Sequence, residues 1–415
     1  MMLTREENEL LTRVGSDRPM GQLFRRYWLP ALFSEEIAKP DCPPVRIKLL
    51  GENLVAFRDS KGKVAIVDEH CPHRRASMFF GRNEECGIRC VYHGWKFDVD
   101  GACVDMPSEP PESTFKDKVT LTSYPCKEHS GLIWTYMGPK ESMPEFPEYD
   151  WMKAPEAHKY ISKTIQETNY MNALEGTFDS SHINFLHVGA LYLTENSRSL
   201  DDLLNVSHPR IIPVETDYGL AVGALRKKDS TSTYCRISQF LMPAISMVPD
   251  NVDDYARAGF VFVPMDDEST LVFTITWNAR RPQTVEEIKG YKEGDSIHNA
   301  LIPGTFYPKA NKENDYLINR ELQASGASFT GIYGIAAADL AVQESSGRIM
   351  DRTKEHLGTS DIAIIHIRKR LMNAAKGLLN GDTPPGLQSK SHKVYPIGLE
   401  LQENDKFEEV VKKYI

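Results

Sequence analysis

Short apolar runs separated by polar turns dominate the first third of the chain. Between Val45 and Gly138, runs such as VRIKLL, VAIV and GLIWTYM have the length and alternation of strands. The segments GEN, SKGK and DVDG fall between such runs and are rich in turn-forming residues. Turns at such short intervals predict an antiparallel β domain built from hairpins.

The pattern changes after residue 138. The segment 139–157 contains four prolines and shows no apolar period, so we place a domain boundary at about residue 150. Helical spacing follows at 169–187, then strand-like runs between 220 and 279, and helical spacing again at about 339–378. This order predicts an α+β domain in which helices cover one face of an antiparallel sheet.

We therefore expect an α+β protein of two domains, 1–150 and 151–415. A chain of 415 residues can bury a core in each domain, so no metal is needed merely for folding. The formal net charge of -9 is spread among mixed charges, which argues against nucleic acid and anionic membranes as partners. The N-terminus has no apolar signal-peptide core and no window is apolar enough to span a membrane, which predicts a cytoplasmic protein.

Residues 69–95, EHCPHRRASMFFGRNEECGIRCVYHGW, contain three of the seven cysteines and three histidines. In a cytoplasmic chain such a cluster indicates metal ligands before disulfides. Cys71 pairs with His73 and Cys90 with His93, and we call these four residues the Cys–His quartet. The quartet could hold a tetrahedral zinc ion or a [2Fe-2S] cluster with two thiolates on one iron and two imidazoles on the other. Because each pair offers one ligand to each iron, the pattern favours the cluster.

The other cysteines and histidines of this stretch have no such pairing. We expect Cys86 to lie in the intervening loop and His70 to point away from the quartet. The remaining cysteines are isolated in the sequence and are expected to be ordinary thiols: Cys42, Cys103, Cys126 and Cys235.

A second group lies in NALEGTFDSSHINFLH. Glu175, Asp179 and His182 are spaced as one face of a helix, and His187 follows five residues later. Two histidines and a carboxylate on one face of an iron leave open positions for oxygen and substrate. Five residues correspond to an offset of about 140° on a helix. The helix is therefore expected to distort or end between His182 and His187.

The third ligand must lie far along the chain, where Asp339, Glu344, Asp351 and Asp361 are the candidates. Asp339 is set in the apolar run AAADLAV, where an unpaired carboxylate is costly to bury and a metal would remove that cost. Asp351 and Asp361 have charged or polar neighbours and are expected to be caps or ion-pair partners.

These motifs resemble those of a known family. The pattern CxH, sixteen residues, CxxHGW resembles the Rieske motif, and NALEGTFDSSHINFLH resembles the catalytic helix of Rieske oxygenases. The resemblance implies a Rieske [2Fe-2S] cluster on the quartet and a mononuclear Fe(II) on His182, His187 and Asp339. It also implies that Asp179 links a cluster histidine to the iron site across a subunit interface.

Similarity to the phthalate dioxygenase branch extends nearly end to end, through EENELLTRVGSDRPMGQLFRRYW, GRNEECGIRCVYHGWKFDVDG and DRTKEHLGTSDIAI. It implies a catalytic domain of helix-grip type and an assembly of one homotrimer or of stacked trimers. It also implies O2 as co-substrate and electrons from NADH, supplied by a separate reductase with FMN and a [2Fe-2S] centre. The chain itself shows no GxGxxG nucleotide-binding fingerprint.

Charged residues suggest the kind of substrate. Arg236, in TYCRISQFLMP, can face inward and hold a carboxylate through two parallel hydrogen bonds, and it resembles one of two arginines that grip a dicarboxylate in the family. Where the second would fall, the chain has Asp201 and Asp202. We expect Arg226 to be solvated.

The motifs thus indicate the oxygenase component of a Rieske aromatic ring dioxygenase system that acts on an aromatic monocarboxylate or a related aromatic anion. It would catalyse cis-dihydroxylation or angular attack with ether cleavage. An O- or N-demethylating monooxygenase is the alternative, because the motifs do not determine which substrate carbon lies over the iron. A Rieske electron carrier would need no second iron site.

Overall fold

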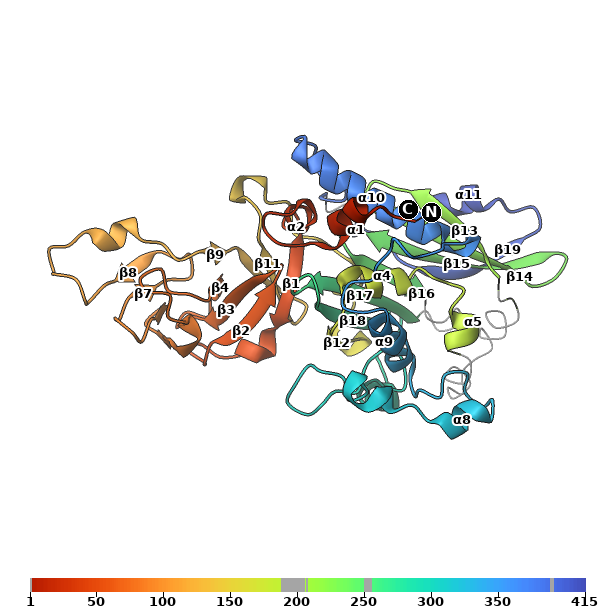
Figure 1. Ribbon diagram of the computed structural model, residues 1–415, viewed down its shortest axis with the longest axis horizontal. Coiled ribbons are helices and arrows are strands. Elements are labelled where there is room, and N and C mark those ends of the chain that lie inside the picture. The colour runs from red at the N-terminus through yellow and green to blue at the C-terminus, as the bar shows by residue number, and fades with distance from the viewer. Residues whose placement is uncertain (1, 188–205, 207, 250–255, 389–391) are drawn as a thin grey trace.

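The computed structural model describes residues 2–187, 206, 208–249, 256–388 and 392–415. Figure 1 shows two groups of sheets along the long axis of the molecule, with small sheets at one end and a large sheet at the other. The predicted class, α+β with an antiparallel β domain and a larger antiparallel sheet with helices, is confirmed. The predicted boundary at residue 150 falls between these groups and stays a prediction.

Three small antiparallel sheets, in the orders β1-β11-β10, β2-β3-β4-β9 and β5-β6-β7-β8, make up the first group. Their strands are β1 (Trp28–Phe33), β2 (Val45–Leu49), β3 (Glu52–Arg58), β4 (Val64–Asp68), β5 (Arg82–Glu84), β6 (Gly87–Arg89), β7 (Lys96–Phe97), β8 (Cys103–Asp105), β9 (Ser123–Tyr124), β10 (Cys126–His129) and β11 (Leu132–Tyr136).

The three predicted turns connect consecutive strands. GEN lies at the β2–β3 turn, SKGK between β3 and β4, and DVDG between β7 and β8. Gly101 ends the last of these with φ of +84°, and a Cβ there would lie 2.0 Å from the carbonyl oxygen of Leu121. Only glycine satisfies both the left-handed backbone and the close approach.

The large antiparallel sheet has eight strands in the order β12-β18-β17-β16-β15-β14-β13, with β19 beside β15. The sequence pattern placed strands between 220 and 279 and so missed three: β12, which precedes α4, β13, which precedes that range, and β19, which follows the last predicted helix. The strands are β12 (Lys159–Gln166), β13 (Arg210–Glu215), β14 (Gly219–Lys227), β15 (Ser232–Leu241), β16 (Ile245–Pro249), β17 (Ala256–Pro264), β18 (Thr270–Asn278) and β19 (Ile397–Gln402).

Helices surround this sheet (Figure 1). Helix α10 packs against β13, β14, α1 and α2, while α4 packs against β17 and α9. The α-helices are α1 (Arg5–Thr12), α2 (Pro19–Phe24), α3 (Asp150–Lys153), α4 (Tyr170–Gly176), α5 (Ile183–Leu186), α7 (Val285–Glu293), α8 (Arg320–Ala324), α9 (Ile335–Ser345), α10 (Ile362–Leu379) and α11 (Phe407–Val410).

The predicted helical segment 169–187 is interrupted twice. Helix α4 ends at Gly176, and the one-turn helix α5 spans Ile183–Leu186. The helix therefore ends between His182 and His187 as the spacing predicted, but a further break before His182, between Gly176 and Ile183, was not expected. Glu175 therefore does not share a helical face with Asp179 and His182.

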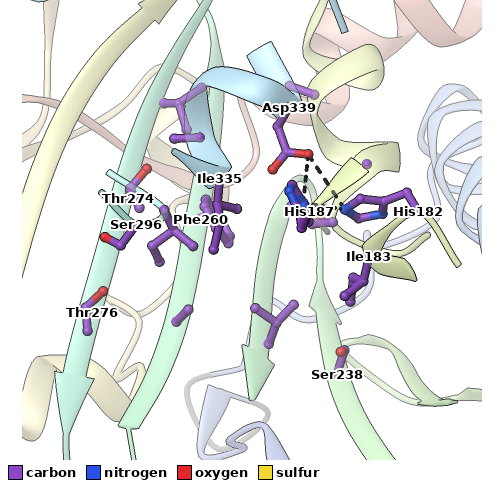
Figure 2. Close-up of a pocket in the computed structure, with 18 of the residues that line it drawn as sticks. His182, Ile183, His187, Ser238, Phe260, Thr274, Thr276, Ser296, Ile335 and Asp339 are labelled. Atoms are coloured by element: carbon purple, nitrogen blue, oxygen red, sulfur yellow. Dashed lines mark hydrogen bonds and ion pairs between the residues drawn. The ribbon is translucent and has the colours of Figure 1, made fainter. Parts of the chain in front are cut away.

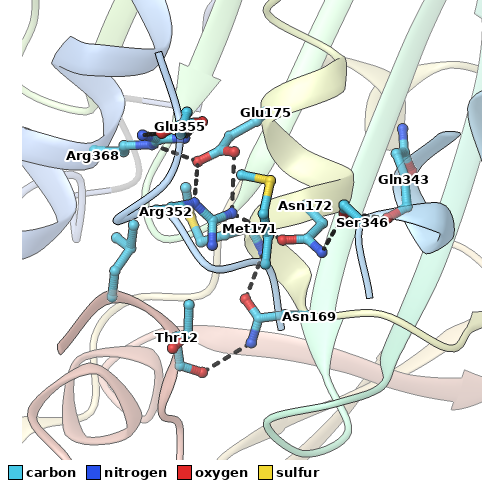
Figure 3. Close-up of polar contacts among 12 residues, drawn as sticks. Thr12, Asn169, Met171, Asn172, Glu175, Gln343, Ser346, Arg352, Glu355 and Arg368 are labelled. Carbon is cyan, nitrogen blue, oxygen red and sulfur yellow. Dashed lines mark hydrogen bonds and ion pairs between the residues drawn. The ribbon is translucent and has the colours of Figure 1, made fainter. Parts of the chain in front are cut away.

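Glu175 instead anchors α4 to distant parts of the chain (Figure 3). Its carboxylate accepts hydrogen bonds from Arg352 Nη2 at 3.1 Å and from Arg368 Nε at 2.7 Å, and Arg368 also pairs with Glu355. Burial alone would raise the pKa of Glu175, but the two arginines outweigh it and lower the pKa. On the same helix, Asn172 accepts from Arg352 Nη2 at 2.9 Å. The network ties α4 to α10 and to the segment before it.

Replacing Glu175 by Gln tests this network. Because Arg352 and Arg368 would lose a buried counter-charge, we expect the free energy of unfolding to fall by about 3 kcal/mol at neutral pH, measured by urea unfolding. The Glu175 pKa is lowered in the fold, so its contribution is present above the pKa of the unfolded carboxyl and is lost as the pH falls through the folded pKa. The gap between variant and wild type should therefore close in acid.

The control is Glu293→Gln, which removes an exposed pair with Lys289 at 3.9 Å. An exposed pair contributes little, so the change should stay within about 0.5 kcal/mol. Equal stability of Glu175→Gln and this control would contradict the assigned role of the network.

Candidate functional site

The Cys–His quartet lies on two loops of the small sheets. Cys71 and His73 follow β4, and Cys90 and His93 follow β6. Gly94 turns the second loop with φ of +80°, and a Cβ there would lie 2.7 Å from Pro107 Cγ. This close approach explains why glycine follows His93 in the motif.

The structure brings the quartet together as two pairs. Cys71 and Cys90 are 1% and 3% exposed, and their thiols interact. The rings of His73 and His93 lie 4.4 Å apart between centroids and are less buried than the thiols. The loops thus present thiols inward and imidazoles outward, as one thiolate-bound and one imidazole-bound iron require.

The chemistry of the quartet fits a cluster. Burial raises the pKa of Cys71 to about 11, and the neighbouring Cys90 thiol adds to this effect. Among the described residues, His73 Nδ1 is buried and has no hydrogen-bond partner. Both the costly thiolate and the unpaired nitrogen are satisfied if they bind iron.

The aromatic neighbours differ in burial. The indole of Trp95 is 3% exposed and stacks on His73 with ring centroids 4.3 Å apart. Tyr92 lies 3.9 Å from the His93 ring but is itself 52% exposed. Of the two, Trp95 shields the quartet from water, and Tyr92 covers His93 at the surface.

Cys86 and His70 lie outside the quartet. Cys86 has a φ of +61° in the turn between β5 and β6, and β6 separates it from Cys90. The ring of His70 lies 3.6 Å from the carboxylate of Asp68. Both placements agree with the sequence-based interpretation.

The second group converges on one point (Figure 2). The Nε2 atoms of His182 and His187 are 3.0 Å apart, and Asp339 Oδ1 lies 3.6 Å from the first and 3.4 Å from the second. Helix α9 supplies Asp339, while the segment around α5 supplies the two histidines. We call these three residues the His–His–Asp triad.

The break between α4 and α5 explains how His182 is oriented. The Asp179 carboxylate accepts from the backbone N–H of Ser181 at 2.9 Å and of His182 at 3.3 Å, which caps the turn. The backbone carbonyl of Asp179 accepts from His182 Nδ1. Because the proton is on Nδ1, Nε2 keeps a free lone pair toward the triad.

The triad fits a metal ion. Two nitrogen ligands at about 2.1 Å from a metal and at a right angle are about 3.0 Å apart, which matches the His182 to His187 separation. Burial lowers the pKa of His182 and so favours the neutral ring that a metal needs. For Asp339, burial would raise the pKa, but the interactions with His187 and His182 outweigh it and lower the pKa. Two neutral imidazoles and one carboxylate are the donor set of non-haem Fe(II) sites.

The other carboxylate candidates have different partners. Glu344 accepts hydrogen bonds from the backbone of Glu167 at 2.8 Å and from the Tyr316 hydroxyl at 2.6 Å. Asp351 accepts from Thr353 and Asp361 from the backbone of Gly358, both as local caps. Of the four, the structure places Asp339 beside the histidines.

Arg226 is not solvated, contrary to expectation. Its side chain is fully buried and donates to the hydroxyl of Ser180 at 3.1 Å and to the carbonyl of Ser180 at 2.6 Å. It lies on β14, and these contacts join β14 to the turn that precedes His182. Burial lowers the Arg226 pKa to about 10, and the nearby Arg236 contributes to this shift. The LRKK run gave no sign that the first of its cations faces inward.

The triad opens onto a cavity of about 420 Å³. Its floor is one face of the large sheet, to which alternate residues of several strands contribute. Strand β18 supplies Val272, Thr274 and Thr276, while the intervening Phe273 and Ile275 pack into the core. Helix α9 and the α4–α5 segment form the opposite side.

Charges in the cavity are unequally placed. Arg236 lines it from β15, as the strand alternation predicted, and donates to the backbone carbonyl of Pro249. It is the only lysine or arginine among the described lining residues. The carboxylates of Asp295 and Glu287 line the part formed by α7 and the following loop, and Glu287 is neutralised by Arg281.

Asp201 and Asp202, on which the expectation of a single substrate carboxylate depended, lie outside the described residues.

Sequence reasoning also missed a buried hydrogen-bonded chain beside the cavity. Ser162 Oγ lies 2.6 Å from His298 Nδ1, and His298 Nε2 lies 2.9 Å from Thr276 Oγ1. His298 is fully buried and its ring centroid lies 4.9 Å from those of both Tyr160 and Tyr291. Burial lowers the His298 pKa to about 3, so its imidazole is neutral. The sequence lacked a signal because His298 has no partner at ligand spacing.

No helix among the described residues is long and apolar enough to cross a membrane.

An antiparallel β domain with a Cys–His quartet, joined to a helix-covered sheet with a His–His–Asp triad, defines the class of Rieske oxygenases. Comparison with known families agrees. Residues 27–125 match the Rieske [2Fe-2S] domain, and residues 135–398 match the family described as LigXa C-terminal domain like. The chain belongs to the Rieske oxygenases, in the phthalate dioxygenase-like branch, as an oxygenase component.

Individual relatives are similar over most of their length. The oxygenase subunit of 3-chlorobenzoate-3,4-dioxygenase from Comamonas testosteroni is 39% identical and covers 93% of this chain and 92% of its own. The oxygenase subunit of phthalate 4,5-dioxygenase from Pseudomonas putida is 38% identical, with 94% and 90% covered. The structure of NdmB from Pseudomonas putida CBB5 has a TM-score of 0.62 at 19% identity, covers 94% of this chain and 100% of its own, and is similar in fold alone.

The buried imidazole of His298 predicts a pH-dependent stability. Unfolded histidine takes up a proton below about pH 6.5, whereas the folded His298 does so near pH 3. The free energy of unfolding should therefore fall as the pH decreases below about 6.5, by up to about 1.4 kcal/mol per pH unit. In His298→Gln one proton fewer is taken up on unfolding. The slope of the unfolding free energy against pH, measured by urea unfolding down to about pH 4.5, should therefore be shallower by up to about 1.4 kcal/mol per pH unit.

The exposed His208 provides the control, since His208→Gln should leave the slope unchanged. An unchanged slope in His298→Gln would show that the imidazole is not kept neutral by the fold.

Proposed function

We propose that this oxygenase component uses O2 and electrons from a separate NADH-oxidising reductase to hydroxylate an aromatic monocarboxylate or a related aromatic anion. The observation that supports this most is the opening of the His–His–Asp triad onto a cavity in which Arg236 is the only cation among the described lining residues. Two relatives that are 39% and 38% identical are the oxygenase subunits of 3-chlorobenzoate-3,4-dioxygenase and of phthalate 4,5-dioxygenase.

The residues have distinct roles in this proposal. The quartet would hold a [2Fe-2S] cluster and the triad a mononuclear Fe(II), which together supply single electrons and oxygen activation. The Asp179 carbonyl keeps the His182 ring in the tautomer that leaves Nε2 free. Phe260 and Ile335 line the cavity near the triad (Figure 2), where their apolar side chains would exclude water.

Electron transfer within one chain would have to pass from one half of the molecule to the other. In Figure 1 the strands beside the quartet are at one end, whereas α5 and α9 lie in the other half. The carboxylate of Asp179 remains 31% exposed, so it can accept a hydrogen bond from outside the chain. We assign it as the bridge to the partner subunit's His93 in a homotrimer or in stacked trimers.

The metal content tests the triad. Asp339→Ala removes one ligand from the proposed mononuclear site but none from the quartet. We expect iron to fall from about three to about two atoms per chain, with the Rieske EPR signal retained. Iron analysis by mass spectrometry and EPR after dithionite measure the two sites separately.

The control is Glu344→Gln on the same helix, whose side chain is bound to Glu167 and Tyr316 and which should keep all the iron. Full iron content in Asp339→Ala would overturn the ligand set. Absence of a Rieske EPR signal from the wild-type protein would contradict a [2Fe-2S] cluster on the quartet.

The charges of the cavity support one carboxylate rather than two. Arg236 can pair with a single carboxylate on its side of the cavity. On the α7 side, burial raises the pKa of Asp295, and Glu293 adds to this effect. The described residues that line this side include no lysine or arginine that could pair with a second carboxylate. A ligand with adjacent carboxylates would have one of them unpaired.

Arg236→Gln tests the recognition of the carboxylate. Loss of a charged hydrogen-bond donor should raise KM for a benzoate about 10-fold to 100-fold with a smaller change in kcat, measured as oxygen uptake with a surrogate reductase. Arg257→Gln is the control, because Arg257 pairs with Asp150 rather than lining the cavity.

The substrates to compare are benzoates, methoxybenzoates, phenoxybenzoates and phthalate. Rapid turnover of phthalate would contradict the preference for a monocarboxylate. Products labelled from 18O2 separate ring dihydroxylation from ether cleavage and from O- or N-demethylation.

A further inference from the structure

Three hydroxyl side chains form a polar strip on the cavity wall: Thr274, Thr276 and Ser296. Figure 2 shows them on the side of β18, across the cavity from His182 and Ser238. Ser296 Oγ is buried and has no hydrogen-bond partner among the described residues. An unpaired buried hydroxyl costs free energy unless a ligand or a water molecule forms a hydrogen bond with it. The strip is therefore a place where a bound molecule would be recognised.

The hydrogen-bond direction of Thr276 follows from the chain behind it. A neutral imidazole has one N–H donor and one acceptor nitrogen. Ser162 Oγ lies 2.6 Å from His298 Nδ1, and hydrogen bonds donated by an O–H group are shorter than those donated by an N–H group. The contact from His298 Nε2 to Thr276 Oγ1 is 2.9 Å, the usual length for an N–H donor. These lengths match a chain in which Ser162 donates to His298 and His298 donates to Thr276.

Burial supports the same direction. Neither Ser162 nor Thr276 has another hydrogen-bond partner for its hydroxyl among the described residues. If the chain ran the other way, the Ser162 proton would be left unpaired behind His298, away from the cavity lining. In the direction inferred here, the free proton belongs to Thr276, which faces the cavity, where a ligand can accept it.

We propose that Thr276 is a specificity-determining residue that donates a hydrogen bond to an uncharged oxygen on the aromatic substrate, and that His298 is the positioning residue that keeps Thr276 a donor. This rests on the proposed function, in which an aromatic monocarboxylate occupies the cavity. Arg236, on β15, binds the carboxylate on the other wall. Asp295, which lines the cavity on the Thr276 side, disfavours a second anion. The acceptor is therefore a methoxy, ether or hydroxyl oxygen.

Isosteric ligands isolate this hydrogen bond. A methoxy group and an ethyl group have nearly the same shape, but only methoxy has an acceptor oxygen. Calorimetric binding of 3- and 4-methoxybenzoate is compared with that of 3- and 4-ethylbenzoate, using the iron-loaded protein without reductase. Wild type should bind at least one methoxybenzoate about fivefold to tenfold more tightly than its ethyl counterpart.

Substitutions at Thr276 test whether its hydroxyl causes the preference for methoxybenzoate over ethylbenzoate. Thr276→Val keeps the shape but lacks the hydroxyl, so the methoxy to ethyl ratio should fall to about one while ethylbenzoate binds as before. Thr276→Ser restores the hydroxyl and should restore the ratio. In turnover, the loss should appear mainly in KM.

Substitutions at His298 test the positioning role. His298→Leu removes the donor to Thr276 and should lower the ratio, whereas His298→Gln keeps an amide N–H donor and should retain most of it. Thermal unfolding identifies any His298 variant that fails to fold. If both fail, Thr276→Val and Thr276→Ser still test whether the hydroxyl sets the methoxy to ethyl binding ratio. Equal effects of His298→Leu and His298→Gln on the ratio would overturn the positioning role.

These outcomes distinguish the role of Thr276 from the proposed function on which it rests. Tight binding of benzoates without a methoxy preference, or a preference that survives Thr276→Val, overturns the role of Thr276 and leaves the proposed function standing. If no benzoate binds to wild type, the proposed function fails, and the role of Thr276 fails with it.

Discussion

Two imidazoles and a carboxylate from distant segments must meet at one point, and the rest of the catalytic half is arranged around that constraint. Two histidines five residues apart cannot share the face of a continuous helix. The chain solves this by making α5 a single turn, Ile183–Leu186, with His182 and His187 as the flanking residues at its two ends. The turn between α4 and α5 lets the Asp179 carbonyl fix the His182 ring.

A broken helix has unsatisfied ends and needs support from both sides. Glu175 holds the end of α4 through two buried arginines, and Arg226 holds the following turn through Ser180. These cations are buried because each has oxygen partners that offset part of its desolvation. The geometry of the His–His–Asp triad is thus maintained by charged groups that do not touch the triad.

The same face of the large sheet provides both the shape of the cavity and its polar groups. Strand alternation turns Arg236 on β15 and Thr276 on β18 toward the cavity at two separate places on the same sheet face, while intervening residues such as Phe273 and Ile275 pack into the core. A flat aromatic ring with a single anionic group matches this distribution better than a ring with two. His298 is buried behind the wall as a neutral group, so it influences Thr276 without adding charge to the cavity.

The sequence by itself determined the local features: the hairpin turns, the quartet, the two histidines and the choice of Asp339. These depend on short-range spacing or on one carboxylate in an apolar run, both visible along the chain. Tertiary structure alone decided where the helix breaks, that Glu175 turns to Arg352 and Arg368, that Arg226 is buried, and that β12 and β19 join the sheet. The physical reason is that burial and hydrogen-bond partners come from residues far apart in the chain, such as Ser162 and His298 or Arg226 and Ser180, and no local pattern records which distant groups will meet.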